Sequence, residues 1–271
     1  MTKVFIELSE IDIKSSRFID TRFILGEPSA GYEAFKECHV SGAVYWNLEK
    51  DLSDMDDFKG RHPMISKEKM IELVQNSGLN LDDKIIIYDQ GEAPFALRAY
   101  FLLEWAGFKN VRVLRQSFEM IKQQLPITDE VAQYTKSNMT PLWNDEIYLT
   151  MDEVRDIANG KRDGQLIDAR SSARYRGEIE PIDHIAGHIP TAINYDWEQL
   201  KRDGAFLEQE LMESQLSNLS NKDKPVIAYC GSGVTAAPLY ASLKEAGYKD
   251  VKLYVGSYSD WIRENDVEKS N

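Results

Sequence analysis

Residues 224–248 read KPVIAYCGSGVTAAPLYASLKEAGY, an apolar segment followed by a glycine-containing loop and a second apolar segment. The first part ends at Tyr229 and is short and apolar enough to predict a buried strand. The part that begins near Val234 or Thr235 has the length and composition of a helix. A buried strand that runs through a tight loop into a helix is typical of a parallel sheet flanked by helices, so this stretch predicts an α/β fold.

The same pattern occurs twice along the chain. Four pairs of segments correspond in order: RFIDTR (17–22) with QLIDAR (165–170), CHVSGAV (38–44) with GHIPTAI (187–193), DKIIIYD (83–89) with DKPVIAYC (223–230), and AGFKNVRVL (106–114) with AGYKDVKLY (246–254). Ordered matches of this kind indicate an internal duplication. One large α/β domain would leave that order unexplained. We therefore expect two tandem α/β domains, each with a central parallel sheet flanked by helices.

The boundary between the two expected domains lies in residues 126–144, which are polar, rich in turn-forming residues and without clear periodicity. Such a composition is typical of a linker. We therefore predict an N-terminal domain of residues 1–140 and a C-terminal domain of residues 141–271.

The composition excludes several classes of protein. The 271 residues are 42% hydrophobic, and 45 Asp and Glu against 32 Lys and Arg give a net charge of −13, which disfavours nucleic-acid binding. No apolar run is long enough to span a membrane and the N-terminus shows no targeting pattern, so we expect a cytoplasmic protein without membrane association. Two cysteines and four histidines form neither a disulfide framework nor a metal site of zinc-ligand spacing.

The residue best placed for chemistry is Cys230, at the end of the predicted strand. A thiol at that point meets the backbone N–H groups of a tight loop and the positive end of the following helix, which favour the nucleophilic thiolate. The alternative is that Cys230 is a small buried apolar residue, as many cysteines are. Cys38 has no glycine-rich loop after it and is predicted to be structural.

The loop CGSGVTA at 230–236, together with the duplication, resembles the two-domain rhodanese-type sulfurtransferases, and most of all the 3-mercaptopyruvate sulfurtransferases. The resemblance covers nearly the whole chain. It implies that Cys230 of the C-terminal repeat carries the activity, whereas Asp89 stands at the matching position of the N-terminal repeat. A carboxylate cannot take up sulfane sulfur, so the N-terminal domain is expected to be catalytically silent.

The activity that the resemblance implies is transfer of sulfane sulfur from 3-mercaptopyruvate, through a Cys230 persulfide, to a thiol or cyanide acceptor. The partners are a small-molecule sulfur donor and a thiol acceptor, for which a thioredoxin-like protein is one candidate, and no cofactor or metal is expected. Ser232 offers a hydroxyl to move a proton near the donor thiol, although it also fits a plain turn residue. The loop N–H groups expected to bind substrate and persulfide are those of Gly231, Gly233, Val234, Thr235 and Ala236.

Other activities fit the loop less well. Phosphatases that use Cys-x5-Arg need an arginine six residues after the cysteine, where this chain has Ala236. Loops of thiosulfate-specific enzymes resemble CRKGVTA and carry cations, whereas Gly231 and Ser232 carry none. A thiosulfate:cyanide sulfurtransferase and a persulfide carrier with little turnover of small donors stay open as alternatives.

The donor carboxylate needs a cation, and the resemblance assigns this role to Arg174 in RYRG at 174–177. Arg170 and Arg176 have simpler explanations as ion-pair partners of Asp168 or of the acidic residues that follow. The animal enzymes have a second arginine shortly before GHIP, where this chain reads EPIDHIAGHIP at 180–190. Its absence leaves the affinity for 3-mercaptopyruvate open, and His184 is predicted to be a surface residue.

In the family, a histidine and an acid of the N-terminal domain relay protons to the loop serine. His62 matches that histidine, and Glu49, 13 residues earlier, stands where the family often has aspartate. Glu49 is longer by one methylene, so its geometry is at risk, and Asp51 is the substitute; a surface position is the simpler explanation for His62. His39 and His188 recur at matching places in both repeats, so they are expected to serve the fold.

Overall fold

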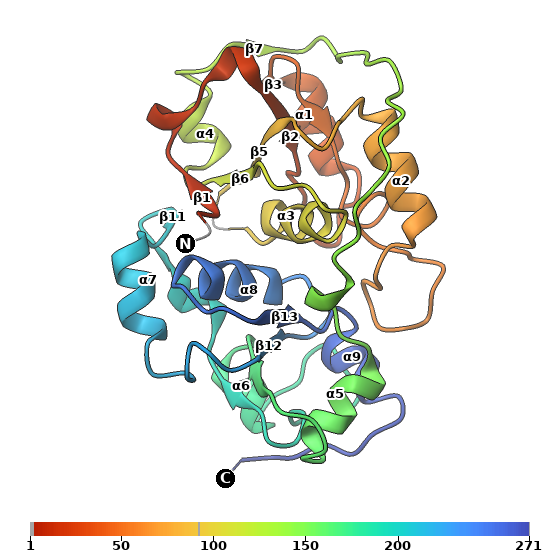
Figure 1. The fold of residues 1–271 in the computed structure, drawn as a ribbon, viewed down its shortest axis with the longest axis vertical. Helices are drawn as coiled ribbons and strands as arrows, with labels where there is room; N and C mark the ends of the chain where they lie inside the picture. Colours follow the sequence, from red (N-terminus) through yellow and green to blue (C-terminus); the bar gives the residue numbers. More distant parts are fainter. Residues whose placement is uncertain (1–2, 92, 271) are drawn as a thin grey trace.

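The computed structural model describes residues 3–91 and 93–270 and contains two separate parallel sheets, one in each half of the chain (Figure 1). The first sheet has the order β1 (Phe5–Ile6), β6 (Val111–Leu114), β5 (Lys84–Tyr88), β2 (Ser16–Asp20), β4 (Val44–Tyr45). The second has the order β13 (Val251–Leu253), β12 (Val226–Tyr229), β8 (Gln165–Asp168), β9 (Ile193–Asn194). The prediction of two α/β domains with parallel sheets is confirmed.

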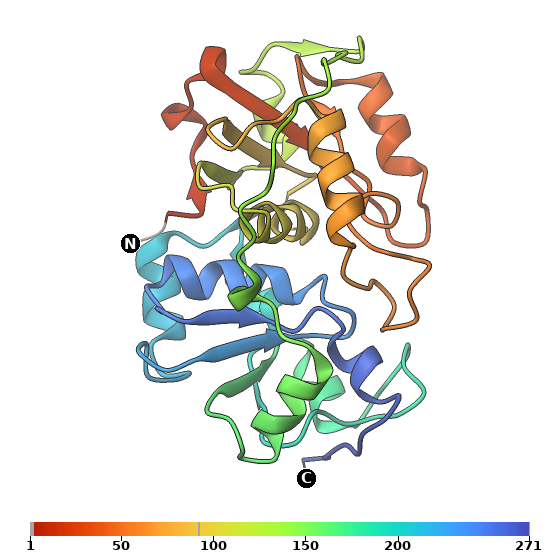
Figure 2. The same ribbon diagram turned by 45° about the vertical axis from the view of Figure 1, so that its right-hand side comes forward.

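Helices lie on both faces of each sheet (Figures 1 and 2). The N-terminal domain contains α1 (Ala30–Glu37), α2 (Lys67–Asn76), α3 (Phe95–Trp105) and α4 (Phe118–Ile121). The C-terminal domain contains α5 (Met151–Ala158), α6 (Ser172–Arg176), α7 (Gln209–Leu216), α8 (Ala236–Glu245) and α9 (Ser257–Trp261). Two antiparallel pairs form separate two-stranded sheets: β3 (His39–Val40) with β7 (Ile127–Thr128), and β10 (Lys201–Arg202) with β11 (Ala205–Phe206).

The two central strands explain why the sheets form where they do. All four residues of β12, and four of the five residues of β5, are buried. Apolar runs without alternation suit strands that are covered by helices on both faces. Each of these strands leads into an apolar helix, which is the unit predicted from residues 224–248.

Helices α3 and α8 follow these strands and pack against each other in the middle of the molecule (Figure 1). Both are buried around nearly their whole circumference, as expected for helices that are apolar on all sides. The rings of Phe101 and Tyr240 meet edge to face at 5.3 Å, and the Tyr240 hydroxyl donates to Glu104 at 2.8 Å. The two domains therefore share an apolar interface along these helices.

The duplication is also visible in the buried polar contacts. Arg22 binds Asp20 and Arg170 binds Asp168, each through more than one hydrogen bond. The Tyr88 hydroxyl accepts the N–H of Val40 at 3.1 Å, and the Tyr229 hydroxyl accepts that of Ile189 at 3.2 Å. Equivalent residues thus make equivalent contacts in both domains.

The segment predicted as a linker lies along the surface of the N-terminal domain and is held there by hydrogen bonds (Figure 2). The Ser137 N–H donates to Gln75 O at 3.0 Å, and the Tyr134 hydroxyl donates to Gly42 O at 2.7 Å. Closer to the second sheet, the Asn144 N–H still donates to Trp105 O at 2.8 Å. The predicted boundary near residue 140 therefore falls inside a segment that is hydrogen-bonded to the N-terminal domain.

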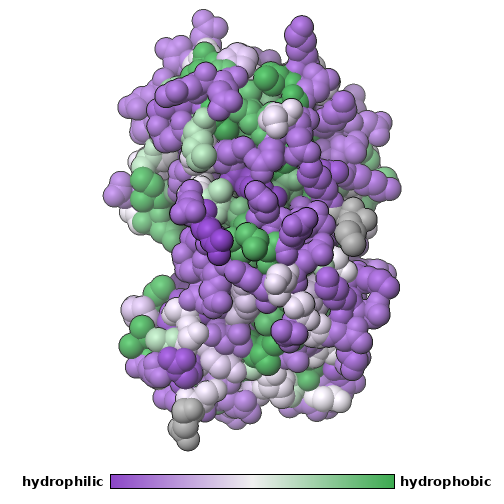
Figure 3. Space-filling model, turned by 90° about the vertical axis from the view of Figure 1, so that its left-hand side faces the viewer, coloured by the Kyte–Doolittle hydropathy of each residue, from purple (hydrophilic) through white to green (hydrophobic). Residues whose placement is uncertain are grey.

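Most of the face shown in Figure 3 is hydrophilic, with apolar side chains in small separate groups. This agrees with the high charge of the chain. In the part of the chain that the structure describes, no helix is long and apolar enough to cross a bilayer.

Glu245 at the end of α8, in the C-terminal domain, binds the backbone at the start of β1 in the N-terminal domain. Its side chain is buried at 2% exposure and accepts the N–H groups of Val4 and Phe5. We expect Glu245→Ala to lower the free energy of unfolding by about 1–3 kcal/mol, because it leaves buried donors without an acceptor. Glu245→Gln keeps one acceptor oxygen and should cost less.

The measurement is urea unfolding followed by circular dichroism. The control is Glu33→Ala, which removes an exposed ion pair with Lys36 and should change stability by less than about 0.5 kcal/mol. A Glu245→Ala variant as stable as the control would show that Glu245 does not hold the domains together.

Candidate active site

Cys230 is the first residue after β12, and its side chain is enclosed at 1% exposure. The Gly233 N–H points at its sulfur, with 3.1 Å between N and Sγ. The structure describes the whole loop and shows no such bond from the other predicted donors, Gly231, Val234, Thr235 and Ala236. Helix α8 begins directly after the loop, so the sulfur lies at a helix N-terminus with one directed N–H, a setting that favours an anion.

The two loop glycines are needed for different reasons. Gly233 has φ +73°, and a side chain there would overlap the carbonyl of Val255. A side chain at Gly231 would begin 2.5 Å from Nη2 of Arg61 and within 3.6 Å of both terminal nitrogens of Arg174. The first glycine to follow Cys230 therefore leaves room for two guanidinium groups beside the thiol.

The first residues of α9 support the loop. The Cys230 N–H donates to the Ser257 hydroxyl oxygen at 3.0 Å, and the N–H groups of Tyr258 and Ser259 donate to the carbonyls of Cys230 and Gly231 at 2.9 Å. Ser257 itself has φ +56°, an unusual conformation for a residue with a side chain. The backbone on both sides of the thiol is thus fixed by residues that the sequence analysis did not single out.

His62 reaches the loop from the N-terminal domain. Its Nδ1 lies 2.9 Å from the Ser232 hydroxyl oxygen, which brings together two residues assigned from the resemblance. Burial, followed by the nearby charges of Arg98 and Arg61, lowers the pKa of His62 to about 4. The ring is therefore neutral at pH 7 and is able to accept a proton from Ser232.

Glu49 is not brought to His62. The structure shows its N–H donating to Asn47 Oδ1 at 3.0 Å, and among the described residues no carboxylate forms a hydrogen bond with the His62 ring. The substitute Asp51 accepts the Asn47 N–H at 2.7 Å. The part assigned to Glu49 thus stays a prediction without an observed contact.

Arg174, to which the resemblance assigns the donor carboxylate, lies beside the loop at Gly231. Arg61 of the N-terminal domain lies beside the same glycine. The Arg174 guanidinium binds Glu180, at 2.7 Å from Nη2 to Oε1, and Asp183 at 3.2 Å. Asp183 also pairs with Arg61 of the N-terminal domain. Arg61 was missed from the sequence, although its place directly before His62 is a signal that it faces the same loop.

The other candidate residues have structural roles. Arg170 binds Asp168, and Arg176 binds Glu178, as their simpler explanations proposed. His39 and His188 place Nδ1 at 2.6 Å and 2.7 Å from the carbonyls of Phe35 and Tyr175. Each also stacks on the ring of that same residue. Their equivalent contacts support the prediction that they serve the fold.

Asp89 takes the place of the thiol in the N-terminal domain. Its two carboxylate oxygens accept the N–H groups of Gly91 at 2.7 Å and Ala96 at 3.1 Å. Burial raises the pKa of Asp89 to about 7, against the effect of these donors. The loop of the N-terminal domain thus holds a carboxyl group where its counterpart holds a sulfur.

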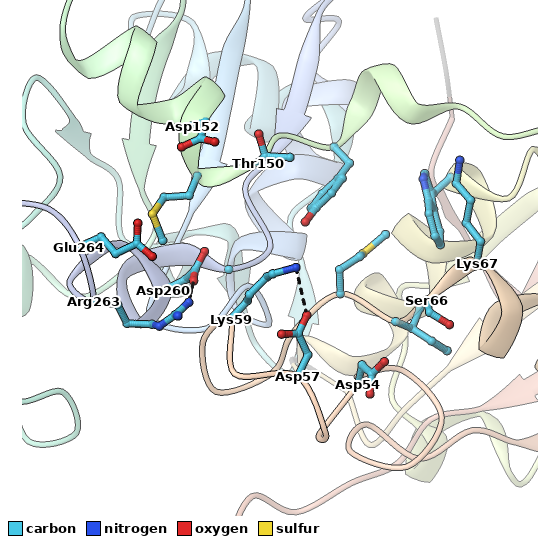
Figure 4. Close-up of a pocket in the computed structure, with 16 residues that line it drawn as sticks. Asp54, Asp57, Lys59, Ser66, Lys67, Thr150, Asp152, Asp260, Arg263 and Glu264 are labelled. Carbon is cyan, nitrogen blue, oxygen red and sulfur yellow. Dashed lines mark hydrogen bonds and ion pairs between the residues drawn. The ribbon is translucent and has the colours of Figure 1, made fainter.

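A separate cavity of about 600 Å³ lies between the domains, but neither Cys230, Ser232 nor His62 lines it. Figure 4 shows its charged side chains paired with each other, Lys59 with Asp57 at 3.5 Å and Arg263 with Asp260 at 2.7 Å. We therefore place the candidate active site at the Cys230 loop and not in this cavity.

Comparisons with known proteins agree with this geometry. A family model described as a rhodanese-like domain matches the chain twice, over residues 7–124 and 150–264. The chain is 36% identical to a probable 3-mercaptopyruvate sulfurtransferase of Pseudomonas aeruginosa, over 94% of this chain and 91% of the relative. It is 35% identical to a provisionally named thiosulfate sulfurtransferase of Mycobacterium tuberculosis, over 90% of this chain and 86% of the relative. The crystal structure of a 3-mercaptopyruvate sulfurtransferase from Escherichia coli is similar with a TM-score of 0.80 at 27% identity, over 95% of this chain and 100% of the other.

The depressed pKa of His62 predicts a pH effect on stability. Between the ordinary value of 6.5 and about 4, the unfolded chain binds a proton at His62 that the folded protein excludes. The contribution of His62 to stability is therefore complete above pH 6.5 and is lost as the pH falls toward 4. Nuclear magnetic resonance of the imidazole should show its midpoint near pH 4, and His62→Gln should flatten the fall of the melting temperature over this range. A midpoint near 6.5 would contradict the buried neutral ring.

Proposed function

The chain belongs to the family of rhodanese-like domain proteins and is a sulfurtransferase, and we propose that it takes sulfur from 3-mercaptopyruvate onto Cys230 and passes it to a thiol or cyanide. The observation that carries the proposal is the 2.9 Å contact between Ser232 and His62 beside a buried thiol. Transfer from a thiol donor requires movement of a proton, and this pair offers a route for it.

Donor binding rests on the two arginines above Gly231. The carboxylate of 3-mercaptopyruvate is a planar anion that fits the fork of a guanidinium. Arg174 is its main partner, and Arg61 adds a second cation from the other domain, since both guanidinium groups lie beside the same loop position. In the free protein Asp183 binds both. Glu180 also binds Arg174, at 2.7 Å from Nη2 to Oε1. We propose that the donor carboxylate takes the place of Asp183 beside the two guanidinium groups.

The sulfur-transfer step follows from these positions. The Cys230 thiolate attacks the donor sulfur, a sulfur–sulfur bond forms, and the carbon–sulfur bond breaks with its electron pair going to the enolate of pyruvate. The donor's thiol proton passes through Ser232 to the neutral His62 ring and returns to the enolate carbon. The Gly233 N–H, which already faces the sulfur, stabilises the negative charge on the persulfide.

The acceptor completes the cycle. A thiolate or cyanide attacks the outer sulfur of the persulfide, and the Cys230 thiolate leaves. We propose a small thiol or the thiol of a thioredoxin-like protein as acceptor, and the cytoplasm as the location. Each step transfers one sulfane sulfur or a proton, and the enolate or the Cys230 thiolate leaves with the electron pair of the broken bond, so the proposed cycle balances without an electron carrier. The N-terminal domain, residues 1–140, takes no part in sulfur binding because Asp89 replaces the thiol.

Thiosulfate is the second candidate donor, because the pair Arg61 and Arg174 also fits its sulfonate group. The neutral side chains at Gly231 and Ser232 favour 3-mercaptopyruvate, since a dianion gains less from a loop without cations.

The assay is turnover with each donor, with cyanide as acceptor. We expect 3-mercaptopyruvate to be preferred and Cys230→Ala to fall to the background rate. Arg174→Ala should raise KM for 3-mercaptopyruvate about 10–100-fold, the effect of losing a charge-assisted hydrogen bond worth about 1.5–3 kcal/mol. Arg176→Ala is the matched control, because its ion pair with Glu178 is exposed. A preference for thiosulfate would show that 3-mercaptopyruvate is not the main donor. If the protein turns over neither donor, a persulfide carrier becomes the favoured function.

A second variant tests the proton route. We expect Ser232→Ala to lower kcat with 3-mercaptopyruvate by about 10²–10⁴-fold, the usual contribution of a positioned proton-transfer group. With thiosulfate, which has no thiol proton to move, the loss should be much smaller. Equal losses with both donors would show that Ser232 only shapes the loop.

A further inference from the structure

Arg98 on α3 is a charged residue that the proposed reaction does not use. Its side chain is completely buried, at 0% exposure. Its Nη2 donates to the carbonyls of Leu52 at 3.2 Å and Pro63 at 3.4 Å. Its Nη1 has no hydrogen-bond partner among the described residues.

The charge of Arg98 lacks the compensation that the other buried arginines have. Arg22 pairs with Asp20 and Arg170 with Asp168, each through a carboxylate at 2.7 Å. Within residues 3–91 and 93–270, Arg98 forms no ion pair with an acid, and its contacts are backbone carbonyls. A buried cation without a counter-charge is unfavourable, so a negative charge that forms close to Arg98 during a reaction would be stabilised by it.

The hydrogen bonds of Arg98 connect it to the segment that reaches the Cys230 loop. The two carbonyls that it binds bracket residues 53–62, the segment that carries Arg61 and His62 to the Cys230 loop. Burial lowers the pKa of Arg98 to about 10, and negative charge on Tyr148 and Cys230 acts against this fall. Of Tyr148 and Cys230, only Cys230 becomes anionic in each cycle of the proposed reaction.

We propose that Arg98 is a positioning residue for sulfur transfer, which clamps residues 52–63 and supplies the buried positive charge that is balanced when Cys230 becomes a thiolate or persulfide. This rests on the proposed function only in that Cys230 is the reacting sulfur. The silent domain thereby contributes a fixed charge to the chemistry of its neighbour. The same charge disfavours protonation of His62 and keeps that ring neutral.

Other groups near Cys230 also affect its ionisation, and they come from several elements. Arg61 and Arg174 lie beside Gly231, and Asp183 pairs with both. His62 contacts Ser232, and Tyr258 of α9 donates its N–H to the Cys230 carbonyl. Arg98 differs from all of these in being fully enclosed, so solvent and salt screen its charge least.

The test is alkylation of Cys230 by iodoacetamide as a function of pH, measured by mass spectrometry in a Cys38→Ser background. Arg98→Met removes the charge, and we expect the midpoint of the alkylation curve to move up by about one pH unit, a tenfold loss of rate at low pH. Arg98→Lys keeps the charge but loses the planar guanidinium that binds the carbonyls of Leu52 and Pro63. Its alkylation midpoint should therefore stay close to that of the parent, while kcat falls. Arg17→Met is the matched control, because Arg17 also binds two backbone carbonyls of its domain, those of Ser77 and Gly78.

An unchanged midpoint in folded Arg98→Met would overturn the proposal, and so would a shift in Arg98→Lys as large as in Arg98→Met. If Arg98→Met does not fold, the His62 midpoint in Arg98→Lys decides: it should stay near pH 4, and a rise to the ordinary imidazole value would overturn the electrostatic part. Alkylation needs no sulfur donor, so its outcome is independent of whether 3-mercaptopyruvate or thiosulfate proves to be the substrate.

Discussion

The packing of α3 against α8 is the constraint on which the site depends. Each helix follows the central strand of its own sheet, so their contact sets the two domains face to face with the ends of β5 and β12 on either side. Only in this arrangement do residues 52–63 lie across the Cys230 loop, where His62 meets Ser232 and Arg61 meets Gly231. Apolar burial between helices, which is not directional, thus places groups whose chemistry is strongly directional.

The duplication explains how the N-terminal domain, which has Asp89 where its counterpart has Cys230, contributes residues to the site. In both domains, backbone N–H groups after the central strand point at the side chain at the start of the loop, and in the first domain the Asp89 carboxyl accepts two of them. Of the charged groups of that domain, Arg61 lies beside Gly231 of the other domain, and Arg98 binds the carbonyls on either side of the segment that carries Arg61 there. The site is formed by two copies whose loops differ in sequence, CGSGVTA at 230–236 against DQGEAPF at 89–95, and which share one interface.

Much of the fold was predictable from the sequence, because the strands and helices of a buried parallel sheet leave apolar runs of characteristic length. Cys230 was predictable for a similar reason, since a strand, a glycine loop and a helix are neighbours in sequence. The meeting of His62 and Ser232 required the family resemblance. Arg98, Ser257 and Asp183 were missed because their importance arises from contacts between distant segments, which leave no periodic signal in either segment.

Glu49 shows the limit of transferring a role by spacing. Its distance of 13 residues from His62 matches the family pattern, but the intervening segment folds so that its N–H and that of Lys50 bind the Asn47 side chain. The need for an acid beside His62 depends on how the ring is kept in the correct protonation state. In this chain burial and two arginines already hold it neutral, and a partner carboxylate would raise its pKa again. A histidine that has only to exchange a proton with Ser232 works best as a neutral base, so a direct acid partner is not required for the step assigned to it.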